Sequence, residues 1–297
     1  MPSLSFTAPT SVDEAVKILA GASGMAKVLA GGTDLLVQLR SGRVKPELIV
    51  DTKKIPELIG IREESDRFVI GASTPGVMIY EHEALTHAWP GIVEGLDLIG
   101  SEQIQGRASL AGNLCNASPA ADSVPAMIAA RATAVIAGPN GRREAPVEAI
   151  VTGPGRTSLE KGEFIVEFHV PKPKPHQSDA YLRFIPRTEM DIAVVGVGVN
   201  VTLDGNGVCT DARVVLGAVA PTQVIAEEAG AALIGHKLDN ETLSKLDAAA
   251  GRACKPIDDK RGTIKYRTKI AGVLLKRTAM IARDRINGIE HRGHRPV

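Results

Sequence analysis

Two runs of small residues are the part of this sequence most suited to chemistry. The first consists of Ala30, Gly31, Gly32, Thr33, Asp34 and Leu35, and the second spans residues 109–122. Small residues let the backbone approach a ligand closely, and consecutive N–H groups in a tight turn form a concavity that binds anions. Because each run leads into an apolar stretch, the pair predicts a long, diphosphate-bearing cofactor held from two sides.

The second run adds polar side chains to its small core, Ala111-Gly112-Asn113. Ser109, Asn116, Ser118 and Asp122 lie close to that core in the sequence, and hydroxyls and amides beside glycine suit phosphate oxygens and ribose hydroxyls. A lone glycine pair is more often structural than ligand-binding, so the second run is what favours a cofactor. The Gly-x-Gly-x-x-Gly fingerprint and the P-loop pattern are both absent from the sequence, which therefore does not predict a Rossmann or P-loop site.

The elements around the first run predict a small βαβ unit. A buried strand over 27–30 leads into the glycines, a helix is expected over 34–40, and a second strand over 48–51. Strand, glycine-rich turn, helix and strand in this order favour a parallel pair. A helix capped by Thr10 or Ser11 precedes the unit.

The middle of the chain has a mixed pattern. We expect an antiparallel hairpin over 58–61 and 68–71, a helix over 124–131, and strands over 134–137 and 164–168. The second run is interpreted as a loop that leads into the helix.

Alternating prolines at 171–175 mark the boundary between two domains, because they are stiff and cannot continue a sheet. Beyond them, the strand-like runs are 180–185, 192–203 and 212–219, and the helical segments are 227–233, 241–253 and 265–286. Asp204-Gly205-Asn206-Gly207 is a hairpin signal between two of the strands. The C-terminal part is therefore expected to be a three-stranded sheet with helices.

Composition excludes several classes of partner. The 297 residues carry a net charge of +1 and only 3% aromatic residues, which speaks against nucleic acid and charged membrane surfaces. Cys115, Cys209 and Cys254 are far apart, so disulfides, zinc sites and iron–sulfur ligation on this chain are not expected. The start, MPSLSFTAPTS, has no signal-peptide pattern and no apolar run is long enough to span a bilayer. We therefore expect a cytoplasmic protein.

Three motifs together resemble the FAD-binding medium subunit of molybdenum hydroxylases, a family that includes carbon monoxide dehydrogenase and bacterial xanthine and nicotinate dehydrogenases. The motifs are the first run, the segment from Gln103-Ile104 to Asp122, and the segment from Tyr266 to Arg277. They occur in the family's order and spacing, and the resemblance extends from about Phe6 to Arg283.

The resemblance implies an α+β fold in two domains. Residues 1–175 would form a two-lobed FAD-binding domain of the vanillyl-alcohol oxidase (PCMH) type, with lobe 1 at about 1–55, lobe 2 at about 56–175 and FAD between them. Residues 176–290 would form a C-terminal domain like that of carbon monoxide dehydrogenase flavoproteins, with a three-stranded antiparallel sheet and a helical bundle. The elements predicted from the residues agree with this arrangement.

The resemblance also implies a set of cofactor-binding residues, with no catalytic residue and no metal ligand on this chain. Backbone N–H groups of the first run and of Ser109, Leu110, Ala111, Gly112 and Asn113 would bind the FAD diphosphate. Asn116, Ser118 and Asp122 would contact the ribityl, ribose or adenine end, and Ile165 would be an apolar flavin contact. Arg183 replaces a lysine that many relatives carry near the flavin ring, which keeps the charge but changes the donor geometry. Ala111 replaces a glycine, and alanine is tolerated there if its φ is negative.

Two arginines near the end of the chain are interpreted as structural residues and not as substrate contacts. Arg261 lies in a charged run, and Arg267 follows it after Tyr266. We expect these residues to hold the C-terminal domain together or to contact a neighbouring subunit.

The resemblance implies an electron-transfer role. Substrate would be oxidised at molybdopterin on a large partner subunit, and electrons would pass through two [2Fe–2S] clusters on a small partner to the FAD of this chain, then to an external acceptor. A dimer of heterotrimers is implied. Two alternatives remain open: a stand-alone flavin oxidase or reductase, which would need a general base over the flavin, and a scaffold without a cofactor. No acid–base pair stands out, which suits electron transfer.

Overall fold

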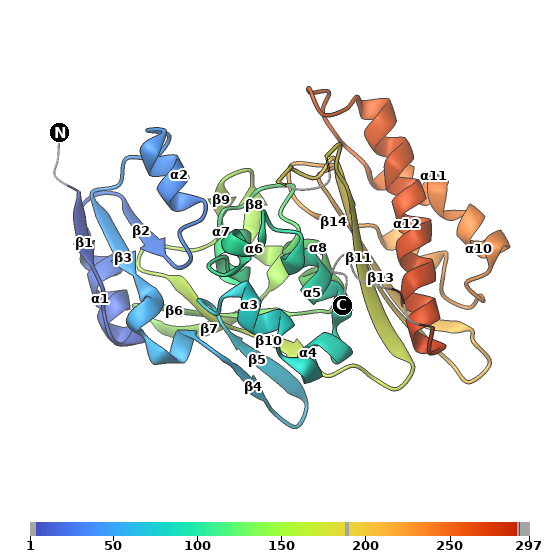
Figure 1. The fold of residues 1–297 in the computed structure, drawn as a ribbon, viewed down its shortest axis with the longest axis horizontal. Coiled ribbons are helices and arrows are strands. Elements are labelled where there is room, and N and C mark those ends of the chain that lie inside the picture. Colours follow the sequence, from blue (N-terminus) through green and yellow to red (C-terminus); the bar gives the residue numbers. More distant parts are fainter. Residues whose placement is uncertain (1–3, 188–189, 290, 292–297) are drawn as a thin grey trace.

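The computed structural model describes residues 4–187, 190–289 and 291. Three regions follow one another along the longest axis of the molecule, and each is built on its own sheet (Figure 1). We call them the N-terminal lobe, the central lobe and the C-terminal domain. Their strand orders are β1-β3-β2, β4-β5-β10-β6-β7 and β11-β12-β13-β14, and a separate small pair is formed by β8 and β9.

The N-terminal lobe confirms the element order and the parallel pairing of the predicted βαβ unit, but the strand before the glycines is mostly exposed instead of buried, with Leu29 as its one buried residue. Its elements are β1 (Ser5–Thr7), α1 (Val12–Gly21), β2 (Ala26–Leu29), α2 (Leu35–Arg40) and β3 (Leu48–Asp51). β3 lies in the middle and pairs in parallel with both neighbours. The Ser11 hydroxyl caps α1 by accepting the N–H of Glu14 at 3.2 Å, as expected for a serine at a helix start.

The central lobe packs short helices on one face of an antiparallel sheet. Its strands are β4 (Ile61–Glu63), β5 (Arg67–Gly71), β6 (Thr133–Gly138), β7 (Gly141–Pro146), β8 (Val151–Gly153), β9 (Arg156–Thr157) and β10 (Phe164–Pro171). Its α-helices are α3 (Gly76–Tyr80), α4 (Glu83–Ala88), α5 (Pro90–Asp97), α6 (Glu102–Gln105), α7 (Leu110–Cys115) and α8 (Ser123–Ala129). Three short 3₁₀ turns complete it, at Thr52–Lys54, Pro56–Leu58 and Val147–Ala149.

β10 contributes to two hydrophobic cores. Ile165 and Phe168 lie in the large core of the central lobe, whereas Phe164 and Val166 pack in the core that contains Val12 of α1. Side chains alternate between the faces of a strand, and a register shift between Ile165 and Glu167 resets the alternation partway along β10. One strand thus joins the N-terminal and central lobes.

The C-terminal domain carries one more strand than expected. Its strands are β11 (Gln177–Phe184), β12 (Val195–Leu203), β13 (Cys209–Gly217) and β14 (Val224–Ile225), and its helices are α9 (Glu227–Ala231), α10 (Asn240–Ser244), α11 (Leu246–Ala253) and α12 (Ile264–Ile286). All three pairings in the sheet are antiparallel. The added strand β14 is a two-residue edge, too short to give an alternation signal in the sequence. The long helix α12 lies along the sheet (Figure 1).

Arg267 stabilises the C-terminal domain through hydrogen bonds and an ion pair, as expected. Its buried guanidinium donates to the carbonyls of Val194 at 2.7 Å and Ala218 at 3.2 Å, and it pairs with Asp259 at 2.7 Å. One side chain thereby joins α12 to both ends of the β12–β13 hairpin.

Over the part of the chain that the structure describes, no helix is both long enough and apolar enough to cross a membrane.

Candidate cofactor-binding site

The first small-residue run lies against the residues that come directly before the second run. We call residues 30–35 the first loop and residues 109–122 the second segment. A Cβ built on Gly31 would overlap the carbonyl oxygen of Arg107 and lie 2.6 Å from its carbon and 3.1 Å from the Ala108 nitrogen. Only glycine allows this approach, and Arg107-Ala108 directly precedes the second segment. The first loop and the start of the second segment therefore lie close together, and the cofactor expected between them stays a prediction.

The first loop keeps its backbone N–H groups free. Among the described residues, no N–H group from 30 to 35 donates to a protein acceptor, whereas the next amide, that of Leu36, bonds to the Gly32 carbonyl at 3.1 Å. Gly32 has a φ of +78°, a conformation that favours glycine. Asp34 precedes α2 but makes no capping bond to it. The loop thus presents consecutive free donors at the start of α2, which suits an anion.

The second segment is partly helical, which corrects the expectation of a loop. Ser109 caps α7, because its hydroxyl accepts the N–H of Gly112 at 3.1 Å. Such a cap supplies an acceptor that the first turn of a helix otherwise lacks. Ala111 lies inside α7 and is not among the residues with positive φ. The condition for alanine at this position is therefore met.

Most polar side chains of the second segment are engaged within the fold. The Asn113 amide oxygen accepts the N–H and the hydroxyl of Ser123, at 3.2 and 2.8 Å. The Ser118 hydroxyl accepts the N–H of Ala120 at 3.2 Å. Consequently, Ser109, Asn113 and Ser118 shape the segment, and direct contact between any of them and a cofactor stays a prediction.

Asn116 connects the second segment to the N-terminal lobe. Its side-chain oxygen accepts a hydrogen bond of 2.9 Å from the amide of Gln38 on α2. This bond joins the helix that follows the first loop to the end of α7. The two lobes are therefore linked by side chains as well as by the Gly31 contact.

Asp122 and Arg183 come together in a buried ion pair. One oxygen of Asp122 accepts the hydroxyl of Tyr181 at 2.8 Å, and the other pairs with the Arg183 guanidinium at 2.7 Å. Burial raises the pKa of Asp122 to about 6, against the opposing effects of Arg183 and Tyr181. The Arg183 side chain is only 4% exposed, and within the described residues its Nε has no partner. Both oxygens of Asp122 are occupied, so in this structure Asp122 holds Arg183 in place.

Ile165 lies away from the surface. It is 4% exposed, pairs across the sheet with Ile136, and belongs to the same core as Leu110 and Ala111. It therefore supports the second segment from within the central lobe, and its contact with a flavin stays a prediction.

Sequence reasoning missed Lys53, Arg107, Gln38 and Tyr181. Tyr181 could have been found, because it lies two residues before Arg183 on one strand and therefore on the same face. Lys53 bonds to the Ala30 carbonyl, the Arg107 backbone contacts Gly31, and Gln38 bonds to Asn116 across the lobes. No periodicity in the sequence signals such contacts.

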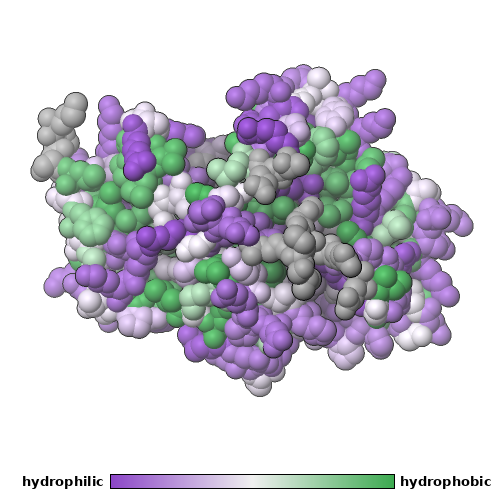
Figure 2. Space-filling view, viewed as in Figure 1, coloured by the Kyte–Doolittle hydropathy of each residue, from purple (hydrophilic) through white to green (hydrophobic). Residues whose placement is uncertain are grey.

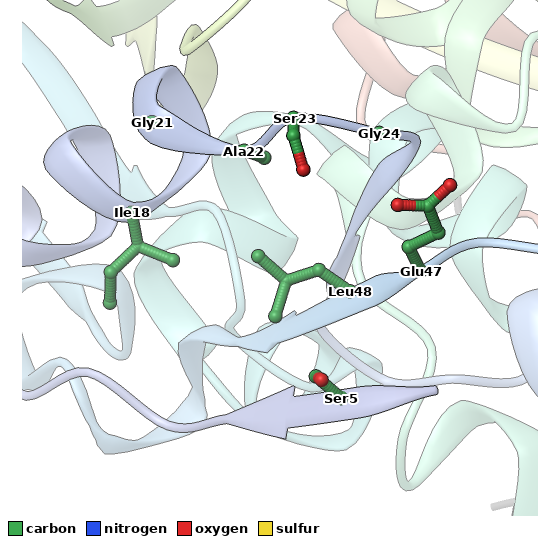
Figure 3. A pocket seen from close by; sticks show the side chains of 8 residues that line it. All are labelled: Ser5, Ile18, Gly21, Ala22, Ser23, Gly24, Glu47 and Leu48. Atoms are coloured by element: carbon green, nitrogen blue, oxygen red, sulfur yellow. The ribbon is translucent and has the colours of Figure 1, made fainter. Parts of the chain in front are cut away.

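A hollow elsewhere on the surface does not include any of the predicted cofactor-binding residues. A hollow of about 470 Å³ lies at the edge of the N-terminal lobe, lined by Ser5, Ile18, Gly21, Ala22, Ser23, Gly24, Glu47 and Leu48, none of which is a predicted site residue (Figure 3). The outline of the molecule dips between the N-terminal lobe and the C-terminal domain (Figure 2). Over the described part of the chain, no group of three or more metal-ligating side chains could hold a metal ion.

Comparison with known proteins gives two consecutive family matches. Residues 2–173 match the FAD binding domain in molybdopterin dehydrogenase, and residues 180–282 match the CO dehydrogenase flavoprotein C-terminal domain.

Individual relatives are similar over almost the whole chain. The carbon monoxide dehydrogenase medium chain of Hydrogenophaga pseudoflava is 35% identical over 93% of this chain and 96% of its own length. The xanthine dehydrogenase FAD-binding subunit of Escherichia coli is 30% identical over 92% and 94%. A chain in the structure of reconstituted CO dehydrogenase from Oligotropha carboxidovorans superimposes with a TM-score of 0.91 at 34% identity, over 96% of this chain and 99% of that chain. This chain therefore belongs to the family of FAD-binding subunits of molybdopterin dehydrogenases.

Proposed function

We propose that this chain is the FAD-binding, electron-transfer subunit of a molybdenum hydroxylase complex. The observation that carries the proposal is the contact of Gly31 with Arg107-Ala108, which places the free amides of the first loop beside the start of the second segment. A diphosphate needs several N–H donors in one place, and this arrangement supplies them without a basic side chain.

The residues present fit FAD in a PCMH-type domain. The first loop, together with the N–H groups of Leu110 and Ala111 at the start of α7, would hold the diphosphate. Asn116 and Ser118 would face the sugar or adenine end. The buried Arg183, held by Asp122, would supply a fixed positive charge near the flavin ring. When bound, the flavin supplies one- and two-electron redox chemistry, and the protein binds it, orients it and limits access of water.

The partners follow from the relatives. Proteins named as a medium chain and as a FAD-binding subunit imply other subunits, and we propose a large subunit with molybdopterin and a small one with two [2Fe–2S] clusters. Electrons would arrive from the clusters and leave to an external acceptor. We further propose a dimer of heterotrimers.

The absorbance spectrum of the purified chain tests this function. After incubation with excess FAD and desalting, we expect flavin bands at about one FAD per chain, because specific binding survives removal of free ligand. Gly31→Ala should lose the bands, since its Cβ would displace Arg107. Gly205→Ala serves as the matched control, because a Cβ at Gly205 meets no atom within 4 Å.

Other outcomes of this experiment have distinct meanings. A wild-type chain that stays colourless with FAD contradicts cofactor binding by the isolated chain and favours a scaffold. Flavin reduction by an organic substrate without partner subunits favours a stand-alone oxidase or reductase.

A further inference from the structure

Two side chains behind the first loop determine which way its peptide groups face. The hydroxyl of Thr52 donates to the Leu29 carbonyl at 3.2 Å, and the ammonium of Lys53 donates to the Ala30 carbonyl at 3.0 Å. These are the two carbonyls immediately before Gly31. Both are held by consecutive residues of a single 3₁₀ turn.

This arrangement orients the amides of the loop. In a planar trans peptide the C=O and the following N–H point in opposite directions. The N–H group of Ala30 must therefore point away from the Thr52 hydroxyl, and that of Gly31 away from the Lys53 ammonium. Consecutive N–H groups on one side form an anion-binding concavity, and these are among the amides that find no acceptor in the described part of the protein.

Lys53 acts through position more than through charge. Its ammonium also pairs with Asp51 at 2.7 Å, and the same Asp51 oxygen accepts the backbone N–H of Lys53 at 3.0 Å. The positive charge is thus balanced beside the loop. Thr52 is fully buried and lies 2.9 Å from the hydroxyl of Ser73, so the turn that carries Lys53 is itself anchored in the central lobe.

We propose that Lys53 is a positioning residue that makes the first loop select a diphosphate-bearing flavin over a phosphate-free one. The proposal rests on the proposed function of the site. Without the Lys53 ammonium, the Ala30 carbonyl is free to turn, and the Gly31 amide turns with it. Interactions with the diphosphate are then weakened, whereas those with the flavin ring are unaffected.

Binding of FAD, ADP and riboflavin to the full-length chain tests the proposal. FAD and ADP carry the diphosphate and riboflavin carries no phosphate, so the three probes separate the loop from the ring site. We expect Lys53→Met to weaken FAD and ADP by about tenfold, the usual size of a lost hydrogen bond to a charged group, and to change riboflavin affinity by less than twofold. Lys53→Arg, which retains a cationic donor, should restore most of the FAD affinity.

Lys54→Met is the matched control, because it removes the same charge from the neighbouring exposed residue. It should leave all three affinities unchanged. If Lys53→Met does not fold, Lys53→Gln provides a polar replacement without the charge.

The possible failures are distinguishable. A wild-type chain that binds neither FAD nor ADP overturns the proposed function and this inference with it. A wild-type chain that binds FAD, with Lys53→Met weakening riboflavin as much as FAD or weakening neither, overturns the inference alone.

Discussion

The first loop and the second segment have similar compositions but different backbones. The first loop stays irregular: its preceding carbonyls are held by Thr52 and Lys53, and its amides remain free. In the second segment, Ser109 caps a helix whose third amide it occupies, and Asn113 bonds to Ser123. The two regions therefore differ in hydrogen bonding: the amides of the first loop find no acceptor among the described residues, whereas the Gly112 amide and the Asn113 side chain of the second segment are engaged within the fold.

The difference separates two properties that small residues are often assumed to bring together. Lack of a side chain allows close approach, as Gly31 against Arg107 demonstrates. Freedom of the amides depends instead on neighbours that take up the carbonyls or the amides. In this protein the amides of the first loop are suited to donate hydrogen bonds, and the residues directly before the second segment form the surface against which Gly31 lies.

The glycines of the two regions should respond very differently to alanine. A Cβ at Gly31 would overlap backbone atoms, so Gly31→Ala should lower the free energy of unfolding by about 3 kcal/mol, the upper end of typical overpacking costs. A Cβ at Gly112 would lie 3.2 Å from the Ser109 hydroxyl, and alanine favours a helix. Gly112→Ala should therefore change stability by less than about 1 kcal/mol. Chemical denaturation measures both, and equal effects would contradict the contrast.

Burial raises the pKa of an acid in both regions, Asp34 in the first loop and Asp122 in the second segment, and the shift of Asp122 is the larger. Because the pKa of Asp122 is about 6 when folded and lower when unfolded, the unfolded chain loses its proton first. The free energy of unfolding should therefore fall as pH rises from about 4 to about 6, by up to about 3 kcal/mol at about 1.4 kcal/mol per pKa unit.

Asp122→Asn should remove this part of the pH profile, measured by denaturation at a series of pH values. A decrease that extends to about pH 7 should persist in the variant, because burial raises the pKa of Asp179 to about 7. A profile identical to that of the wild type between pH 4 and 6 would show that Asp122 does not titrate there.

Loss of the α7 cap should have the smallest effect. Ser109→Ala removes the acceptor of the Gly112 amide and should cost about 1 kcal/mol, the usual value for a serine cap. Ser101→Ala is the matched control, because the Ser101 hydroxyl makes no capping bond to α6 and donates instead to the exposed side chain of Gln103, so the change should cost at most about 0.5 kcal/mol. Thermal unfolding of both variants measures the difference. If the two cost the same, the helix in the second segment does not depend on its cap.

Much of the fold was predictable because it is encoded locally. The apolar run over 48–51 and the glycines after residue 30 predicted the parallel unit, and the structure confirms it. The structural role of Arg267 was also predicted and is confirmed. The family was predicted from motif order and is confirmed by the comparisons.

The parts that could not be predicted depend on contacts between distant residues. The pairing of Asp122 with Tyr181 spans 59 positions, and Lys53 reaches back 23 positions to Ala30. The helix in the second segment was missed because small residues and glycine conceal an ordinary serine cap. The binding residues themselves remain predictions, because a ligand's contacts are not encoded in the chain alone.

The division of β10 between two cores also bears on how the protein folds. Phe164 and Val166 stabilise the N-terminal lobe, and Ile165 and Phe168 stabilise the central lobe, so neither core can form completely without this one strand. Regions that share a buried element tend to open together as one cooperative unit. The hydrogen-bonded amides of β3 in the N-terminal lobe and of α7 in the central lobe should therefore gain and lose their protection from hydrogen exchange in the same step, and the N-terminal lobe is not a separable module.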